Sequence, residues 1–147
     1  MTGDADLAAL YQDRVRHWAA RVRNDRRLSL ADLTVTKKSP ICGSALTLDV
    51  RAQGRTIQEL GYRVRACTLG MASAAVVVAT APGRPVEETL AAGQRLRALL
   101  AGEDACFPPP WEALEMFMAA RDFPTRHSSI LLPFEALAEA FSAPTPA

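Results

Sequence analysis

Two runs of alternating apolar and polar residues limit most strongly what this chain can fold into. Residues 46–51 and 60–65 each alternate in this way, which is the periodicity of a half-buried β-strand. Gln53–Thr56 lies between them and contains a glycine, a residue that readily adopts the positive φ of a tight turn. The two runs therefore predict an antiparallel hairpin, and a third strand is expected near residues 33–36.

The rest of the chain has helical patterns. Apolar residues recur every three or four positions from Leu7 to Val22, and further helices are expected over 69–80, 86–100, 111–120 and about 132–141. Pro133 suits only the first turn of the last helix, because proline has no amide hydrogen to donate. Strands followed by helices predict an α+β fold, in which about five helices pack against a small antiparallel sheet.

Length and composition favour a single domain. The chain has 147 residues, of which 49% are hydrophobic, enough for one core. We expect this domain over residues 1–142 and a disordered tail over 143–147. The formal net charge of +1 is too small to attract nucleic acid by itself. No signal peptide or membrane-spanning run is present in the sequence, so a cytoplasmic protein without a membrane partner is expected.

The three cysteines, Cys42, Cys67 and Cys106, are candidates for thiol or metal chemistry rather than for disulfides. If the hairpin loop is the four residues Gln53–Thr56, Cys42 lies directly opposite Cys67, with Cβ atoms about 4.5–5.5 Å apart. A two-residue loop makes the two cysteines diagonal neighbours. Either register lets both sulfurs reach one ion.

Cys67 also lies where the second strand gives way to a helix. The positive end of the helix dipole is then close to the sulfur and favours a thiolate. Thiolates bind soft metals and attack persulfides. The alternative is that Cys42 and Cys67 are half-buried residues that act only as small apolar side chains, and the residue pattern alone leaves both interpretations open.

Three segments resemble the NifU/IscU/SufU family of iron–sulfur cluster assembly scaffolds. Residues 40–44 are similar to the family's Pro-x-Cys-Gly-Asp, residues 67–74 to its Gly-Cys-x-x-x-x-Ala-Ser, and residues 123–129 to the Phe-Pro-Ala-Arg-x-x-Cys of the SufU type. The long interval after Cys67 also suits the SufU branch. The resemblance covers residues 7–141 and implies an IscU/SufU-like fold.

The resemblance also implies a metal or cluster site, which is incomplete in this chain. Family members hold the metal or the nascent cluster with three cysteines and an aspartate. Cys42 and Cys67 match two of these cysteines, but Ser44 stands at the aspartate position and Ser129 at the third cysteine position. A serine hydroxyl is a poor ligand because it must first give up a tightly held proton.

Two other residues are candidates for replacing a missing ligand. Cys106 lies in the extra loop before three consecutive prolines, and His127 lies two residues before the lost cysteine position. The implied cofactor is therefore an iron–sulfur cluster or iron, with zinc as an alternative, or no metal at all.

Three functions follow from the resemblance. The first is a scaffold or carrier that binds iron or a labile cluster through Cys42 and Cys67, with Cys106, His127 or a second subunit of a homodimer completing the shell. The second is a SufU-like sulfur acceptor, in which Cys42 or Cys67 takes up a persulfide from a cysteine desulfurase, and the basic first helix or Arg126 helps to dock that enzyme. The third is an adaptor that keeps the fold without the metal.

An independent enzyme is not expected, because the usual nucleophile, phosphate and zinc-hydrolase motifs are missing from the sequence. The expected partners are cysteine desulfurase and other iron–sulfur assembly proteins.

Overall fold

A three-stranded sheet and a set of helices form the fold in the computed structural model, which describes residues 12–41 and 43–142. The elements in chain order are α2 (Asp13–Ala20), β1 (Leu33–Lys38), β2 (Ala45–Gln53), β3 (Thr56–Arg65), α3 (Thr68–Thr80), α4 (Val86–Leu100), the 3-10 helices η1 (Glu112–Ala120) and η2 (Pro124–Arg126), and α5 (His127–Ser142). The expected α+β class and third strand are confirmed. The expected tail, residues 143–147, lies outside the described residues.

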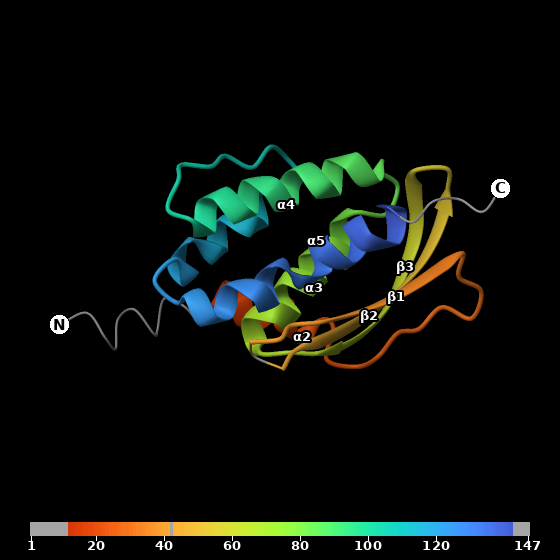
Figure 1. Ribbon diagram of the computed structural model, residues 1–147, viewed down its shortest axis with the longest axis horizontal. Coiled ribbons are helices and arrows are strands. Elements are labelled where there is room, and N and C mark those ends of the chain that lie inside the picture. Colours follow the sequence, from red (N-terminus) through yellow and green to blue (C-terminus); the bar gives the residue numbers. More distant parts are fainter. Residues whose placement is uncertain (1–11, 42, 143–147) are drawn as a thin grey trace.

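The helices are stacked in layers on one face of the sheet. Helix α5 contacts β1 and β2, α3 contacts β3, and α4 packs against α5 on the side away from the sheet (Figure 1). The inner sheet residues Leu48 and Val50 are fully buried, as are Val76 of α3 and Leu137 of α5. Because α3 lies between other elements, its sequence is apolar all round rather than striped.

The hairpin register is as expected at the turn but not at the open end. Ala52 pairs with Ile57, and Gly54 has a φ of +61°. Arg51, however, pairs with Glu59, so Gln58 is an extra residue that shifts the register by one. The expectation that this register continues to the cysteines is therefore wrong. The ladder ends at the pair of Ala45 and Arg65.

The last helix begins earlier than expected. Helix α5 starts at His127, so residues 127–129 form its first turn and Pro133 lies inside it. An internal proline removes one helical hydrogen bond and disfavours a helix by about 3 kcal/mol. Burial of most residues from 129 to 137 offsets this loss. Residues 112–120 are also helical, but as a 3-10 helix.

The free edge of β3 is covered near both ends. Tyr62 and Arg26 exchange two backbone hydrogen bonds of 2.7 and 2.9 Å, and the Ile57 amide donates to the Arg84 carbonyl at 3.0 Å. These segments occupy backbone groups that an edge strand otherwise exposes. In the part of the chain that the structure describes, no helix is long and apolar enough to cross a membrane.

Asp49 pins the segment before β1 to the outer face of the sheet. Its buried carboxylate accepts hydrogen bonds from Arg27 Nε and Nη2 at 2.7 and 3.0 Å, from the Leu28 amide at 3.0 Å and from the Thr34 hydroxyl at 2.8 Å. Gly61, opposite Asp49, leaves room for this segment, since a Cβ there would lie 2.6 Å from the Leu28 nitrogen. The Arg27 hydrogen bonds hold the pKa of Asp49 down at about 2.

We expect Asp49→Asn to lower the free energy of unfolding by about 2 to 4 kcal/mol at neutral pH, because it leaves the Arg27 guanidinium poorly paired. The folded-state pKa of Asp49 lies below its unfolded value, so the ionised carboxylate stabilises above about pH 4, and this contribution is lost as the pH falls toward 2. Urea unfolding of the wild type and the variant should therefore differ most near pH 7 and converge at low pH.

Asp13→Asn is the control for this measurement. The Asp13 side chain is 97% exposed although it pairs with Arg16, so its replacement should change stability by less than about 1 kcal/mol. A pH-independent difference between wild type and Asp49→Asn would contradict the role given to the Asp49 charge.

Candidate functional site

Cys67 caps the N-terminus of α3, as expected. Strand β3 ends two residues before it, and α3 begins directly after it. Its backbone is extended, with φ −65° and ψ 168°, and its carbonyl accepts the first helical hydrogen bond, from the Met71 amide at 2.9 Å. The side chain is only partly buried. Cys67 is therefore not enclosed in the core.

Two serines from distant parts of the chain lie next to Cys67, one in contact with its sulfur and the other in contact with the first serine. The thiol donates a hydrogen bond to Ser129 Oγ at 3.6 Å, and Ser44 Oγ lies 2.7 Å from the same oxygen. Ser44 and Ser129 are 3% and 0% exposed. The structure thus brings together three of the four positions that the family resemblance assigns to ligands. Cys42 lies outside the described residues, so its meeting with Cys67 stays a prediction.

Gly70 makes this meeting of α3 and α5 possible. A Cβ at residue 70 would lie 2.5 Å from Ser129 Oγ and 2.9 Å from Ala66 Cβ. Both distances are shorter than van der Waals contact allows. The missing side chain therefore forms the notch that receives the Ser129 hydroxyl.

A second serine pair lies beside the first. Ser39 Oγ and Ser128 Oγ are 2.7 Å apart, and the Ser39 amide donates to the Ser44 carbonyl at 2.8 Å. The two hydroxyl pairs join both ends of the connection between β1 and β2 to the first turn of α5 by hydrogen bonds. Figure 1 shows these segments at the same end of the molecule. Sequence reasoning missed Ser39, although its position at the end of β1 places it opposite Ser44.

His127 and Cys106 have other surroundings. His127 Nε2 is 2.7 Å from the Ala120 carbonyl oxygen and so links the start of α5 to η1. Cys106 is exposed, and its carbonyl accepts a hydrogen bond from Arg95 of α4 at 3.0 Å. Among the residues that the structure describes, no three His, Cys, Asp or Glu side chains form a group that could hold a metal ion.

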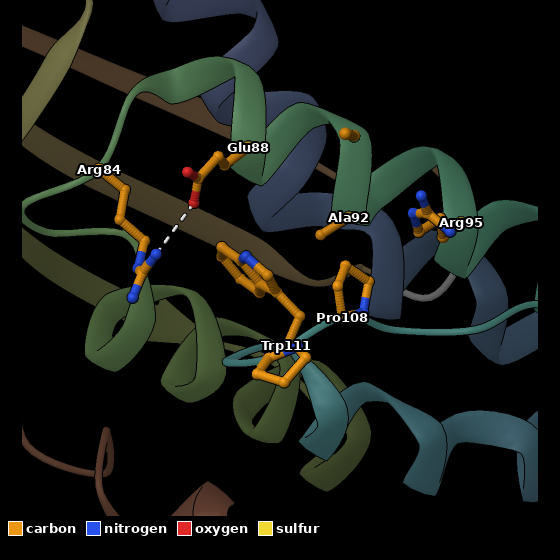
Figure 2. A pocket seen from close by; sticks show the side chains of 8 residues that line it. Arg84, Glu88, Ala92, Arg95, Pro108 and Trp111 are labelled. Atoms are coloured by element: carbon orange, nitrogen blue, oxygen red, sulfur yellow. Dashed lines mark hydrogen bonds and ion pairs between the residues drawn. The ribbon is translucent and has the colours of Figure 1, made fainter.

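The segment that carries Cys106 packs along α4, where it forms one wall of a groove of about 320 Å³. Figure 2 shows Trp111 and Pro108 facing Glu88, Ala92 and Arg95 of α4 across this groove, with Arg84 paired to Glu88 at 3.1 Å. None of the groove residues belongs to the cluster around Cys67. The groove and the thiol are therefore separate features.

The donors that the structure describes around Cys67 do not fit a metal ion well. Its two buried oxygens belong to serines that are hydrogen-bonded to each other, and neutral hydroxyls are weak ligands for zinc or iron. What the cluster does offer is an accessible thiol beside two hydroxyls, which is suited to thiol chemistry.

Comparison with known protein families and relatives gives consistent matches. Residues 10–106 match the family model described as NifU-like N terminal domain. The zinc-dependent sulfurtransferase SufU of Bacillus subtilis (strain 168) is 22% identical over 137 residues, which cover 93% of this chain and 92% of that protein. The iron–sulfur cluster assembly scaffold protein IscU 1 of Archaeoglobus fulgidus is 25% identical over 81 residues, 55% of this chain and 53% of that protein.

Solved structures give the same result for the fold. The N-terminal part of a nitrogen-fixing NifU-like protein from Brucella abortus superposes with a TM-score of 0.87 and 26% identity, covering 93% of this chain and 95% of that chain. A putative iron–sulfur cluster assembly scaffold protein for the SUF system from Fervidobacterium islandicum AW-1 has a TM-score of 0.80 at 19% identity, with 90% and 97% covered. The second match supports the fold alone.

Gly70→Ala tests the notch at the site. In an open helix alanine would stabilise by about 1 kcal/mol relative to glycine, but here we expect a loss of about 1 to 3 kcal/mol because the new Cβ collides with Ser129 Oγ. Urea unfolding measures the loss. The loss should shrink when Gly70→Ala is combined with Ser129→Ala, and an unchanged loss in that background would show that contact with Ser129 does not set it.

Proposed function

The chain belongs to the NifU-like N-terminal domain family, and we propose that it serves iron–sulfur cluster assembly by accepting sulfur on the Cys67 thiol. One observation carries this proposal. The cluster keeps a partly exposed thiol at the N-terminus of α3, while two of the family's other ligand positions hold hydroxyls that are hydrogen-bonded to each other. The site is therefore better equipped for thiol chemistry than for coordination.

Two similarities support this choice of chemistry. The Bacillus subtilis relative, which matches over nearly the whole chain, is named a sulfurtransferase. Other relatives are named iron–sulfur cluster assembly scaffold proteins, so sulfur handling and cluster assembly occur together among them. We propose the persulfide of a cysteine desulfurase as the donor.

The transfer is a thiol–disulfide type of exchange. The Cys67 thiolate attacks the terminal sulfur of the donor persulfide, a new S–S bond forms at Cys67, and the donor's S–S bond breaks. The donor cysteine leaves as a thiolate, and the terminal hydrogen stays on the transferred sulfur. No oxidant or reductant is consumed, because one persulfide replaces another.

The local structure suits this step in two ways. Cys67 is only partly buried, which leaves room for a donor cysteine to approach. The N-terminal end of α3 presents the positive end of its dipole to the attacking sulfur. Ser129, which accepts the S–H hydrogen bond, keeps the side chain oriented.

A scaffold or carrier for iron or a labile cluster is the second candidate function. The similarity to IscU of Archaeoglobus fulgidus favours it. In this function the cluster is cargo, held by Cys67 and Cys42, and thiolates of a second subunit complete the shell. A second subunit is part of this proposal because a cluster needs several thiolate ligands, and serines stand at the positions of Ser44 and Ser129.

Trapping of the persulfide tests the first function. After incubation with cysteine desulfurase and cysteine, alkylation and mass spectrometry should find one additional sulfur atom on Cys67. Cys67→Ser should reduce the adduct at least about tenfold, because a hydroxyl is not a thiolate nucleophile. Cys106→Ser is the matched control and should leave the adduct unchanged. An adduct that survives Cys67→Ser and disappears in Cys42→Ser would rule out Cys67 as the acceptor.

Anaerobic reconstitution with iron and sulfide tests the second function. A scaffold should retain iron and show cluster absorbance, and both should be lost in the double variant Cys42→Ser, Cys67→Ser. A colourless wild-type protein without iron, under conditions that load an intact family member, would exclude the scaffold function but leave sulfur acceptance in place.

A further inference from the structure

The two buried hydroxyls of the site are hydrogen-bonded to each other at a distance shorter than the spacing of two oxygens on one tetrahedral metal ion. Ser44 Oγ and Ser129 Oγ are 2.7 Å apart, whereas two oxygens bound to one tetrahedral zinc at about 2.1 Å each would be about 3.4 Å apart. The contact between Cys67 Sγ and Ser129 Oγ, at 3.6 Å, would be compatible with a shared ion. The misfit therefore arises from the serine pair.

Metal binding would also break the hydrogen bond that holds the two serine side chains in place. Each would have to give up the hydrogen bond between them and then coordinate as a neutral oxygen or lose a proton. Both side chains are buried, and breaking a buried hydrogen bond has a cost that weak binding of zinc by neutral hydroxyls does not offset. The two hydroxyl oxygens are thus already engaged in a hydrogen bond with each other and are poorly placed to act as metal ligands.

The charges near the site do not favour a divalent cation. A hollow on the outer face of the sheet is lined by Lys38, Arg63 and Arg65, and Lys38 and Arg65 are the last residues of β1 and β3 before the site. Asp25 pairs with Arg63 at 3.7 Å and with Arg65 at 2.8 Å, so the two arginines share one carboxylate. The ends of β1 and β3 next to the site therefore carry more positive than negative side chains.

From these observations we infer that this chain accepts sulfur without zinc, and that the Ser44–Ser129 hydrogen bond occupies the position of the metal ion. This inference rests on the proposed sulfur acceptance at Cys67. It separates the chain from its Bacillus subtilis relative, whose name describes it as zinc-dependent. The hydrogen bond joins the connection before β2 to α5, so the site keeps its shape without an ion.

The wild-type chain provides the first test. Purified from zinc-supplemented cells, it should hold less than about a tenth of a zinc ion per chain, because hydroxyl donors bind zinc weakly. Treatment with a zinc chelator should change the rate of persulfide formation on Cys67 by less than about twofold. About one bound zinc per chain, or loss of sulfur acceptance after chelation, would overturn the inference.

Introducing stronger donors at the same two positions provides the second test. The double variant Ser44→Asp, Ser129→Cys should gain about one zinc ion per chain, since a carboxylate and a thiolate then join Cys67. Circular dichroism establishes whether the variant folds, and the single variant Ser129→Cys, with a partial gain expected, replaces it if it does not. A folded variant that gains no zinc would show that the hydroxyl pair does not occupy a metal position.

The sheet offers a matched control for this gain of zinc. Thr36 Oγ1 and Thr47 Oγ1 form another hydroxyl pair, 2.9 Å apart, on the exposed face. Thr36→Asp, Thr47→Cys introduces the same donor types away from Cys67, and zinc should stay at the wild-type level. Equal zinc in both double variants would contradict a specific site at Cys67. Absence of persulfide in both zinc-free and zinc-treated wild-type protein would instead overturn the proposed function itself.

Discussion

The insertion of the Ser129 hydroxyl into the notch at Gly70 is the contact on which the site depends. It occurs where the first turn of α5 meets the first turn of α3, and the connection between β1 and β2 closes over it through Ser44. Three segments that are far apart in the sequence meet there, α3 at Gly70, α5 at Ser129 and the connection between β1 and β2 at Ser44. The sulfur of Cys67 takes its surroundings from this junction, since its hydrogen-bond partner is the same Ser129 oxygen.

The alternating and helical patterns were sufficient to predict the strands, α3, α4 and the placement of Cys67 at a helix N-terminus. They could not predict the extra residue Gln58, because a bulge leaves the apolar alternation on either side of it intact. The start of α5 is predicted too late because Pro133 disfavours a helix locally. Local propensity does not include the burial of the surrounding side chains, which compensates for the one missing hydrogen bond. Cys42, predicted to oppose Cys67, lies outside the described residues.

The serine pairs show a different limit of sequence reasoning. Comparison with the family motif shows that Ser44 and Ser129 stand at ligand positions, and it indicates only that neither residue is a good metal ligand. Only the structure shows that Ser44 and Ser129 are hydrogen-bonded to each other, and that Ser39 and Ser128 form a second hydroxyl pair next to them. The two serines are best understood together, because each buried hydroxyl is a hydrogen-bond partner of the other.

The covered edge of β3 has a consequence for the behaviour of the protein at high concentration. A bare sheet edge is a template for a strand from another molecule, but the backbone of β3 is already engaged near its start and near its end, by Arg84 and by Arg26. The opposite edge is formed by β1, which is short and finishes with Lys37 and Lys38. Lys37 is paired with Glu139, and charged side chains at the end of an edge strand disfavour pairing with a second copy. Both borders of this small sheet are thus protected against self-association into extended β-structure.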